Sequence, residues 1–287
     1  MEKKDNAFRA KDLSKEKIIK HVKDTMGIDV TVVGPDDTVC LECKQCGKCC
    51  TGACVNQLLL HPADVYRILK NTDMSFEELA SKSRLFIGHT SGLPLMLIPV
   101  VEMNDGTPMC IFLKDGKCSI HDYKPNACRM YPLGRAIGES DVRYILQDST
   151  CGISSTNKEI KVSDWLGDIG QSNEIAKAEN KMFADIYDIC DMAELRKFFI
   201  EAEMQNVGDA FYNHILQLMY DFDTERDILE QIPQRSLQIQ LAVLAILFQG
   251  FIQPQDSLTE KVKDIVKVDD IAAKAKELIA ELKKLAK

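Results

Sequence analysis

The density of cysteine between residues 40 and 54, where the sequence reads CLECKQCGKCCTGAC, constrains this chain more than any other feature. A C-x-x-C turn brings two sulfurs to one side of a tight loop, and repeating the turn places several thiolates around one or two centres. Thiolates are ligands that zinc and iron–sulfur clusters take in proteins. The stretch therefore predicts a soft-metal site. It holds six of the chain's 11 cysteines, which are Cys40, Cys43, Cys46, Cys49, Cys50 and Cys54.

Five further cysteines lie outside this stretch. Four of them fall in predicted turns or at the ends of predicted strands, where metal ligands are usually found. Cys190 instead lies in a helical pattern and is expected to pack as a small apolar side chain. We therefore expect eight ligands, enough for two four-thiolate sites or for one site with a redox partner. The eight are Cys43, Cys46, Cys49, Cys50, Cys110, Cys118, Cys128 and Cys151, and the weaker candidates are Cys40, Cys54 and His121.

The spacing of the cysteines bears on which metal they bind. Cys40, Cys43, Cys46 and Cys50 follow the C-x2-C-x2-C-x3-C order of bacterial ferredoxins, with Thr51 where those proteins have proline. Zinc ribbons instead separate their C-x2-C pairs by about 15–20 residues. The pattern favours a [4Fe–4S] cluster over Zn²⁺ or Fe²⁺, and leaves free thiols in thiol-exchange chemistry as an alternative. Because adjacent side chains diverge, the neighbouring Cys–Cys pair is expected to serve two centres, or to supply only one ligand.

Composition excludes several classes of partner. A net charge of −8 is poorly suited to neutralising phosphates, so we expect no binding to nucleic acid. The longest apolar run, residues 237–252, is interrupted by glutamine and glycine and is shorter than the roughly 20 residues of a membrane helix. No apolar secretory segment is visible at the start, and 11 cysteines without one indicate a reducing compartment. We therefore expect a cytoplasmic protein, away from membranes, whose cysteines bind metal.

The distribution of residue types predicts an α+β fold in three parts. Residues 1–26 are expected to form a lysine-rich helical extension, and residues 27–160 a cysteine-cluster metal-binding domain of short strands and loops. Residues 161–287 carry repeated apolar residues at helical spacing and predict an α-helical domain. If the protein has a protein partner, we expect this helical domain to bind it.

One hairpin is predicted in detail. Asp115–Gly116 is a preferred pair for the centre of a two-residue type I′ turn. With this pair at the turn, Leu113 is expected opposite Cys118, and Cys110 opposite His121. The hairpin would therefore bring two candidate ligands into one small unit.

Four sequence blocks in a fixed order carry a family resemblance. They are Cys43-x2-Cys46-Gly47-x-Cys49-Cys50, Cys110-Ile111-Phe112-Leu113, Cys118-Ser119-Ile120-His121 and Pro125-x2-Cys128-Arg129-x-Tyr131-Pro132. Together they make about residues 40–152 resemble the CxxCxxCC cysteine-cluster family, whose members are called YkgJ-like and are described as zinc- or iron-chelating proteins. The family includes flagellin lysine N-methylases, so the resemblance also implies a methyltransferase as an alternative.

Three functions are therefore open at this point. The first is a metal-binding protein with one or two cysteine-ligated centres, redox-active or organising a functional site. The second is a protein lysine N-methyltransferase, although no glycine-rich loop after a strand indicates a site for a methyl donor. The third is an interaction module in which zinc fixes a loop-rich fold and does no chemistry.

Overall fold

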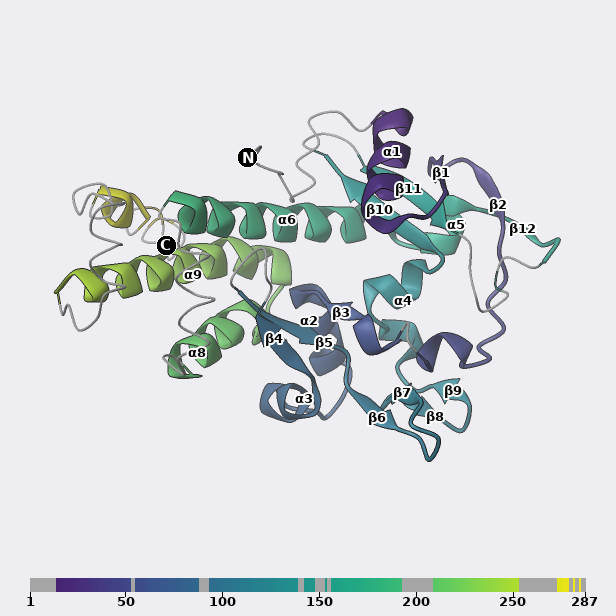
Figure 1. Ribbon diagram of the computed structural model, residues 1–287, viewed down its shortest axis with the longest axis horizontal. Coiled ribbons are helices and arrows are strands. Elements are labelled where there is room, and N and C mark those ends of the chain that lie inside the picture. Colours follow the sequence, from purple (N-terminus) through teal and green to yellow (C-terminus); the bar gives the residue numbers. More distant parts are fainter. Residues whose placement is uncertain are drawn as a thin grey trace. The chain divides into compact units, whose positions relative to one another are not determined.

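The computed structural model shown in Figure 1 confirms an α+β fold, with short antiparallel strands in the cysteine-rich part and helices toward the C-terminus. It divides into two compact units, which are described separately. The first contains Met1–Leu60 and Leu97–Lys177, and the second contains His61–Met96 and Ala178–Lys287. The residues that the structure describes are 14–52, 55–87, 93–138, 142–147, 153, 156–192, 209–252, 273–278, 281 and 284.

This division groups residues 61–96 with the later helices, whereas the sequence placed them inside the domain of residues 27–160. A compact unit is defined by contacts in the folded state, and a domain by its ability to fold alone. The predicted limits at residues 26 and 160 therefore stay a prediction.

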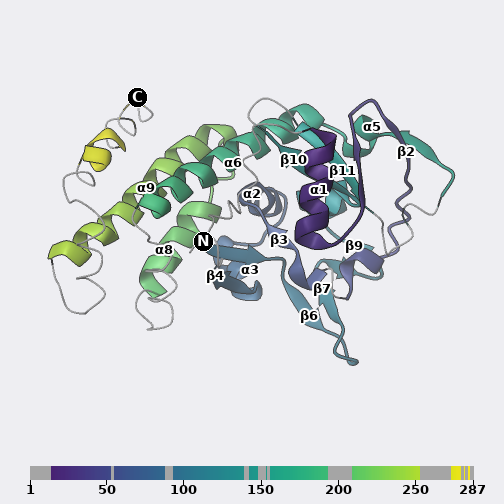
Figure 2. The same ribbon diagram turned by 45° about the horizontal axis from the view of Figure 1, so that its top comes forward.

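A three-stranded antiparallel sheet, in the order β1-β11-β10, organises the first unit. Alternate side chains of the sheet enter two separate apolar clusters, as the twofold repeat of a strand requires. One cluster joins Val32 and Ala136 to Ile18 of α1, and Figure 2 shows α1 beside β10 and β11. The other joins Leu133 and Tyr144 to α5. The bounds are α1 Lys15–Met26, β1 Val30–Val33, β10 Leu133–Ile137, β11 Val142–Gln147 and α5 Val162–Leu166.

Short elements carry the cysteines of the first unit. Three antiparallel pairs, β2 with β12, β6 with β7 and β8 with β9, alternate with single turns of 3-10 helix and the short helix α4. Their bounds are β2 Thr38–Cys40, η1 Lys48–Cys50, η2 Val55–Gln57, β3 Leu59–Leu60, β6 Val100–Glu102, β7 Pro108–Cys110, β8 Leu113–Lys114, β9 Lys117–Cys118, η3 His121–Tyr123, α4 Asn126–Met130 and β12 Glu159–Lys161.

The predicted turn of the hairpin is confirmed, and its predicted length is wrong. Leu113 pairs with Cys118, and both Asp115 and Gly116 have the positive φ values, 51° and 73°, that a type I′ turn requires. Cys110, however, pairs with Val100 of β6 and not with His121, which lies in η3. The hairpin stops early because β7 pairs with β6 instead of extending β8.

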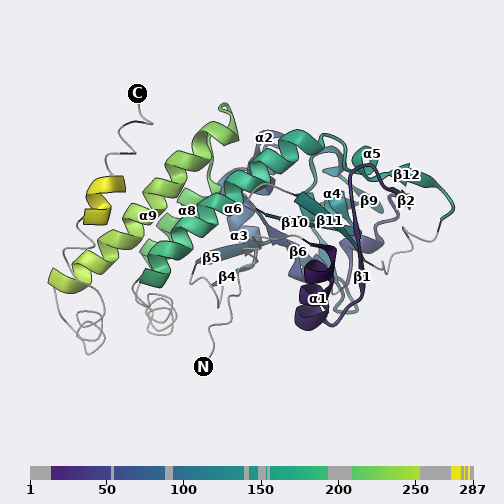
Figure 3. The same cartoon turned by 90° about the horizontal axis from the view of Figure 1, so that it is seen from above.

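Helices dominate the second unit. Helix α8 packs on α9 and on α2, and Figure 3 shows α8 and α9 side by side. Helix α9 continues through Pro233. No helix among the described residues is apolar enough over sufficient length to cross a membrane. The bounds are α2 Pro62–Lys70, α3 Phe76–Lys82, β4 Leu85–Ile87, β5 Pro94–Leu97, α6 Ile169–Met192, α8 Asp209–Tyr220 and α9 Ile228–Ile252. The first residues of α6 belong to the first unit.

Candidate metal centre

The cysteines of two separate sequence segments meet at one cavity of about 310 Å³ in the first unit. The cavity gathers seven of the eight candidate ligands, and the eighth, Cys151, lies outside the described residues. All the cysteines that can be described are free thiols. The seven that line the cavity are Cys43, Cys46, Cys49, Cys50, Cys110, Cys118 and Cys128.

Two left-handed residues shape the first segment. Gln45 and Gly47 have φ values of 51° and 73°, and η1 begins directly after Gly47. A Cβ atom at Gly47 would lie 3.0 Å from a methyl carbon of Leu113 and 3.2 Å from the carbonyl oxygen of Gly116. The cysteine loop is therefore packed against the β8–β9 hairpin at a position where only glycine fits without a shift.

Backbone contacts join the other end of this segment to β7. Thr51 forms an isolated antiparallel bridge with Met109, and the amide of Gly52 donates a hydrogen bond of 2.8 Å to the carbonyl of Pro108. These contacts bring Cys50 toward Cys110, the last residue of β7. The two cysteine segments are thus held together by the fold, without any disulfide among the described cysteines.

The thiols differ in their protonation. The Cys49 and Cys50 sulfurs are 4.0 Å apart. Their hydrogen bond lowers the pKa of Cys49 to about 6, with a further contribution from the positive charge of Lys124, although burial opposes the shift. The same hydrogen bond raises the pKa of Cys50, so Cys50 keeps its proton and donates it to the Cys49 thiolate. Burial raises the pKa of Cys110 to about 11 and also raises that of Cys118.

Polar and aromatic residues complete the cavity wall, among them His121, which the sequence had indicated as a weaker candidate ligand. Lys124 lies with its Nζ atom 3.1 Å from Nε2 of His121, and both residues line the cavity. Trp165 also lines it, and its ring N–H donates to the carbonyl of Met130. Lys44 and Lys48 also line the cavity, and their positions between the cysteines could have predicted this. Nothing in the sequence around Trp165 indicates that it belongs to the site.

Neither of the two weaker candidate cysteines is placed at the cavity, and Cys190 was not expected there. Cys40 is exposed in β2, where it pairs with Glu159, and it is not among the lining residues. Cys54 lies outside the described residues, and the backbone of Cys190 belongs to α6, as the helical pattern predicted. The ferredoxin-like spacing that begins at Cys40 is therefore not gathered as one set among the residues described.

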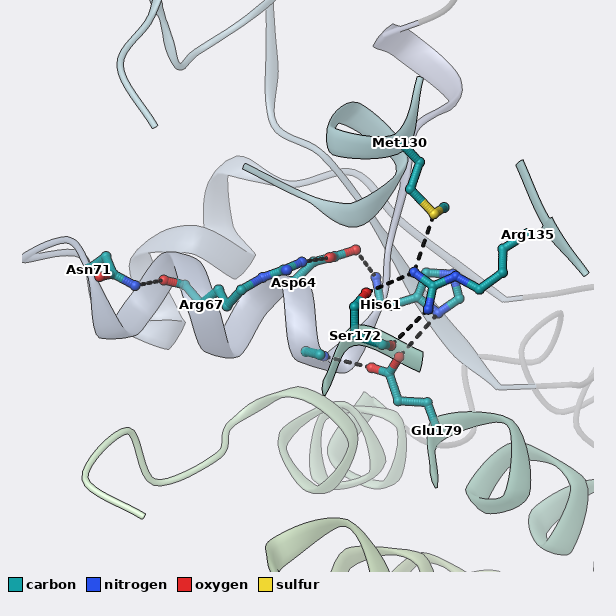
Figure 4. A network of polar contacts seen from close by, with 9 residues as sticks. His61, Asp64, Arg67, Asn71, Met130, Arg135, Ser172 and Glu179 are labelled. Carbon is teal, nitrogen blue, oxygen red and sulfur yellow. Dashed lines mark hydrogen bonds and ion pairs between the residues drawn. The ribbon is translucent and has the colours of Figure 1, made fainter. Parts of the chain in front are cut away.

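Arg135 has a structural role in the first unit. Its guanidinium donates to the Met130 sulfur, and to the backbone carbonyl and the hydroxyl of Ser172, as the right-hand side of Figure 4 shows. It also donates to the side-chain oxygen of Asn173. These hydrogen bonds join β10 to α4 and to the first turns of α6.

The donor set fits iron or zinc, because both metals take thiolate ligands. Within the described ranges, no three His, Cys, Asp or Glu side chains already form a group that could hold an ion. The thiols line a common space and would have to turn inward to share one centre. Metal binding at such a site is coupled to side-chain ordering and to proton release from neutral thiols.

A comparison with known protein families bears on this cavity. Residues 42–152 match the model of the CxxCxxCC family. The family is described as a "Putative zinc- or iron-chelating domain". The matched segment of this CxxCxxCC region contains all seven thiols that line the cavity, and metal chelation is the function that the match supports. The corresponding searches of curated proteins and of solved structures gave no match.

Proposed function

We propose that this protein binds a polynuclear metal centre, an iron–sulfur cluster in preference to zinc, through cysteines of its CxxCxxCC region. The observation that carries the proposal is the convergence of seven thiols, from segments 43–50 and 110–128, on one cavity. The proposed ligands are Cys43, Cys46, Cys49, Cys50, Cys110, Cys118, Cys128 and Cys151, of which a cluster would use four.

Size and ligand number support a cluster over a single ion. Four sulfurs at about 2.3 Å complete the coordination of one zinc ion and leave no empty space at the centre. The cavity instead has a volume of about 310 Å³. On the same measure a single water molecule needs roughly 10–15 Å³, so this space would hold far more than one small ion. Seven thiols also exceed the four of a closed zinc site.

The residues of the chain prepare the site for a charged group. Cys49, with its pKa lowered to about 6, is already a thiolate at neutral pH, whereas Cys110 and Cys118 must lose protons before they can bind metal. Lys124 lies close enough for its charge to favour the thiolates of both Cys49 and Cys118, and so offsets the negative charge that the ligands gather. A bound cluster would supply one-electron transfer, and a bound zinc ion would supply a fixed crosslink.

Metal analysis of anaerobically purified protein, with an absorption spectrum of the same sample, tests the proposal. We expect iron and acid-labile sulfide in stoichiometric amounts, and a brown colour that bleaches with dithionite. Colourless protein with stoichiometric zinc would instead favour a structural zinc module. Protein that binds S-adenosylmethionine in calorimetry would favour the methyltransferase. Protein that binds neither metal would contradict the proposal.

A further inference from the structure

A buried acidic group lies in the second unit, away in sequence from the cysteines. Glu179 of α6 is almost completely buried, and one of its carboxylate oxygens accepts a hydrogen bond of 2.7 Å from the amide of Ala63 in the first turn of α2. Its other oxygen lies 4.0 Å from Nδ1 of His61, the residue before α2. Figure 4 shows Glu179 facing His61.

A second buried carboxylate near the start of α2, Asp64, is paired with a group that is always charged. Asp64, which is fully buried, accepts a hydrogen bond of 3.0 Å from the amide of His61 and forms an ion pair with Arg67. Arginine stays protonated at all accessible pH values, so its charge is always present. Glu179 instead faces a histidine, which is charged only when it carries a proton.

The groups that face Glu179 come from both helices packed against it. His61, Asp64 and Arg67 act on it from the start of α2, and Tyr220 from α8. Burial raises the pKa of Glu179, and Asp64 adds to the shift, while His61 and Arg67 oppose it. Burial also raises the pKa of Tyr220, which stays neutral.

We propose that a proton held on Glu179 fastens the start of α2 to α6, and that loss of this proton at rising pH weakens the second unit. With the proton, Glu179 is a neutral acid that can stay buried beside the Ala63 amide. Without it, a charged carboxylate is left buried, which is unfavourable.

The sign of the pH dependence follows from linkage. Because the pKa of Glu179 is raised in the folded protein, its contribution to stability is complete below the ordinary value of 4.5 and is lost as pH rises toward the raised value.

Urea unfolding of the full chain between pH 5 and pH 9, for the wild type and for Glu179→Gln, tests the proposal. The glutamine keeps an oxygen for the Ala63 amide but cannot ionise. We expect Glu179→Gln to become more stable relative to the wild type as pH rises. The ratio of the wild-type unfolding constant to that of the variant should increase by up to about tenfold per pH unit. Glu174→Gln, at an exposed position of the same helix, is the matched control and should run parallel to the wild type.

A second variant keeps the test decisive if Glu179→Gln does not fold. His61→Gln, at a half-exposed position, removes a group that opposes the raised pKa of Glu179, so the loss of stability should extend to higher pH. An unchanged pH profile in His61→Gln, or the same slope in Glu179→Gln as in the wild type, would overturn the proposal. These results do not depend on whether the cysteine cavity binds metal.

Discussion

At the scale of single residues, Gly47 allows the first cysteine segment to pack closely against the β8–β9 hairpin. It combines a φ of 73° with a Cβ position only 3.0 Å from Leu113 and 3.2 Å from the Gly116 carbonyl. We expect Gly47→Ala to lower the free energy of unfolding by more than the roughly 1–2 kcal/mol of a left-handed alanine, because the hairpin must also shift. Gly106→Ala is the control, since Gly106 has a φ of 78° with nothing within 4 Å. Equal losses in urea unfolding would argue against a contact that only glycine permits.

The proposed ligands can be tested by replacing individual cysteines and measuring metal content. Cys46→Ser and Cys128→Ser each remove a sulfur from the cavity wall, one from each segment, and are expected to lose metal and to destabilise the CxxCxxCC region. Cys190 belongs to α6, and Cys190→Ser should retain the wild-type metal content. Elemental analysis of the three purified variants gives the comparison. The same metal content in all three would contradict the ligand assignment.

At the scale of elements, one local turn was predicted correctly and another was missed. The turn at Asp115 and Gly116 was predictable because its backbone conformation depends on those two residues. The pairing of Cys110 with Val100 is also local, across residues 103–107, and the Asp105–Gly106 pair in that loop is the signal that could have indicated it.

At the candidate site, the spacing of residues in the sequence was informative, and contacts between distant segments could not be predicted. The sequence predicted which cysteines gather, since spacing marks them, and the cavity holds seven of the eight. It could not predict that Cys40 would be held away by β12, or that Trp165 would join the wall. Both depend on contacts between segments more than 30 residues apart.

The start of α3 offers a test of a local signal. The Ser75 hydroxyl accepts a hydrogen bond of 3.1 Å from the amide of Glu78, as a helix N-cap does. We expect Ser75→Ala to lower the free energy of unfolding by about 1 kcal/mol. Ser81→Ala, on the exposed side of the same helix, should change it much less. Urea midpoints of both variants decide the matter, and a larger effect at Ser81 would contradict the assignment of the cap.

At the scale of the whole molecule, the two compact units should respond differently to metal removal. All seven lining thiols belong to the first unit, so metal binding stabilises that unit directly. We expect a chelator to accelerate amide hydrogen exchange in residues 108–130, and to leave exchange in the α8–α9 pair close to its original rate. Uniform acceleration across both units would show that metal acts on the whole chain.

The sequence positions of the cavity-lining cysteines also set an order of events during synthesis. Cys50 and Cys110 are 60 residues apart, and the intervening chain includes the segment His61–Met96 of the second unit. At about 5–20 residues per second, a ribosome releases the first four thiols several seconds before the others. During that interval the nascent chain presents sulfurs whose partners have not yet been made. Completion of the centre is therefore a late step, and the emerging chain depends on its surroundings to keep those sulfurs reduced.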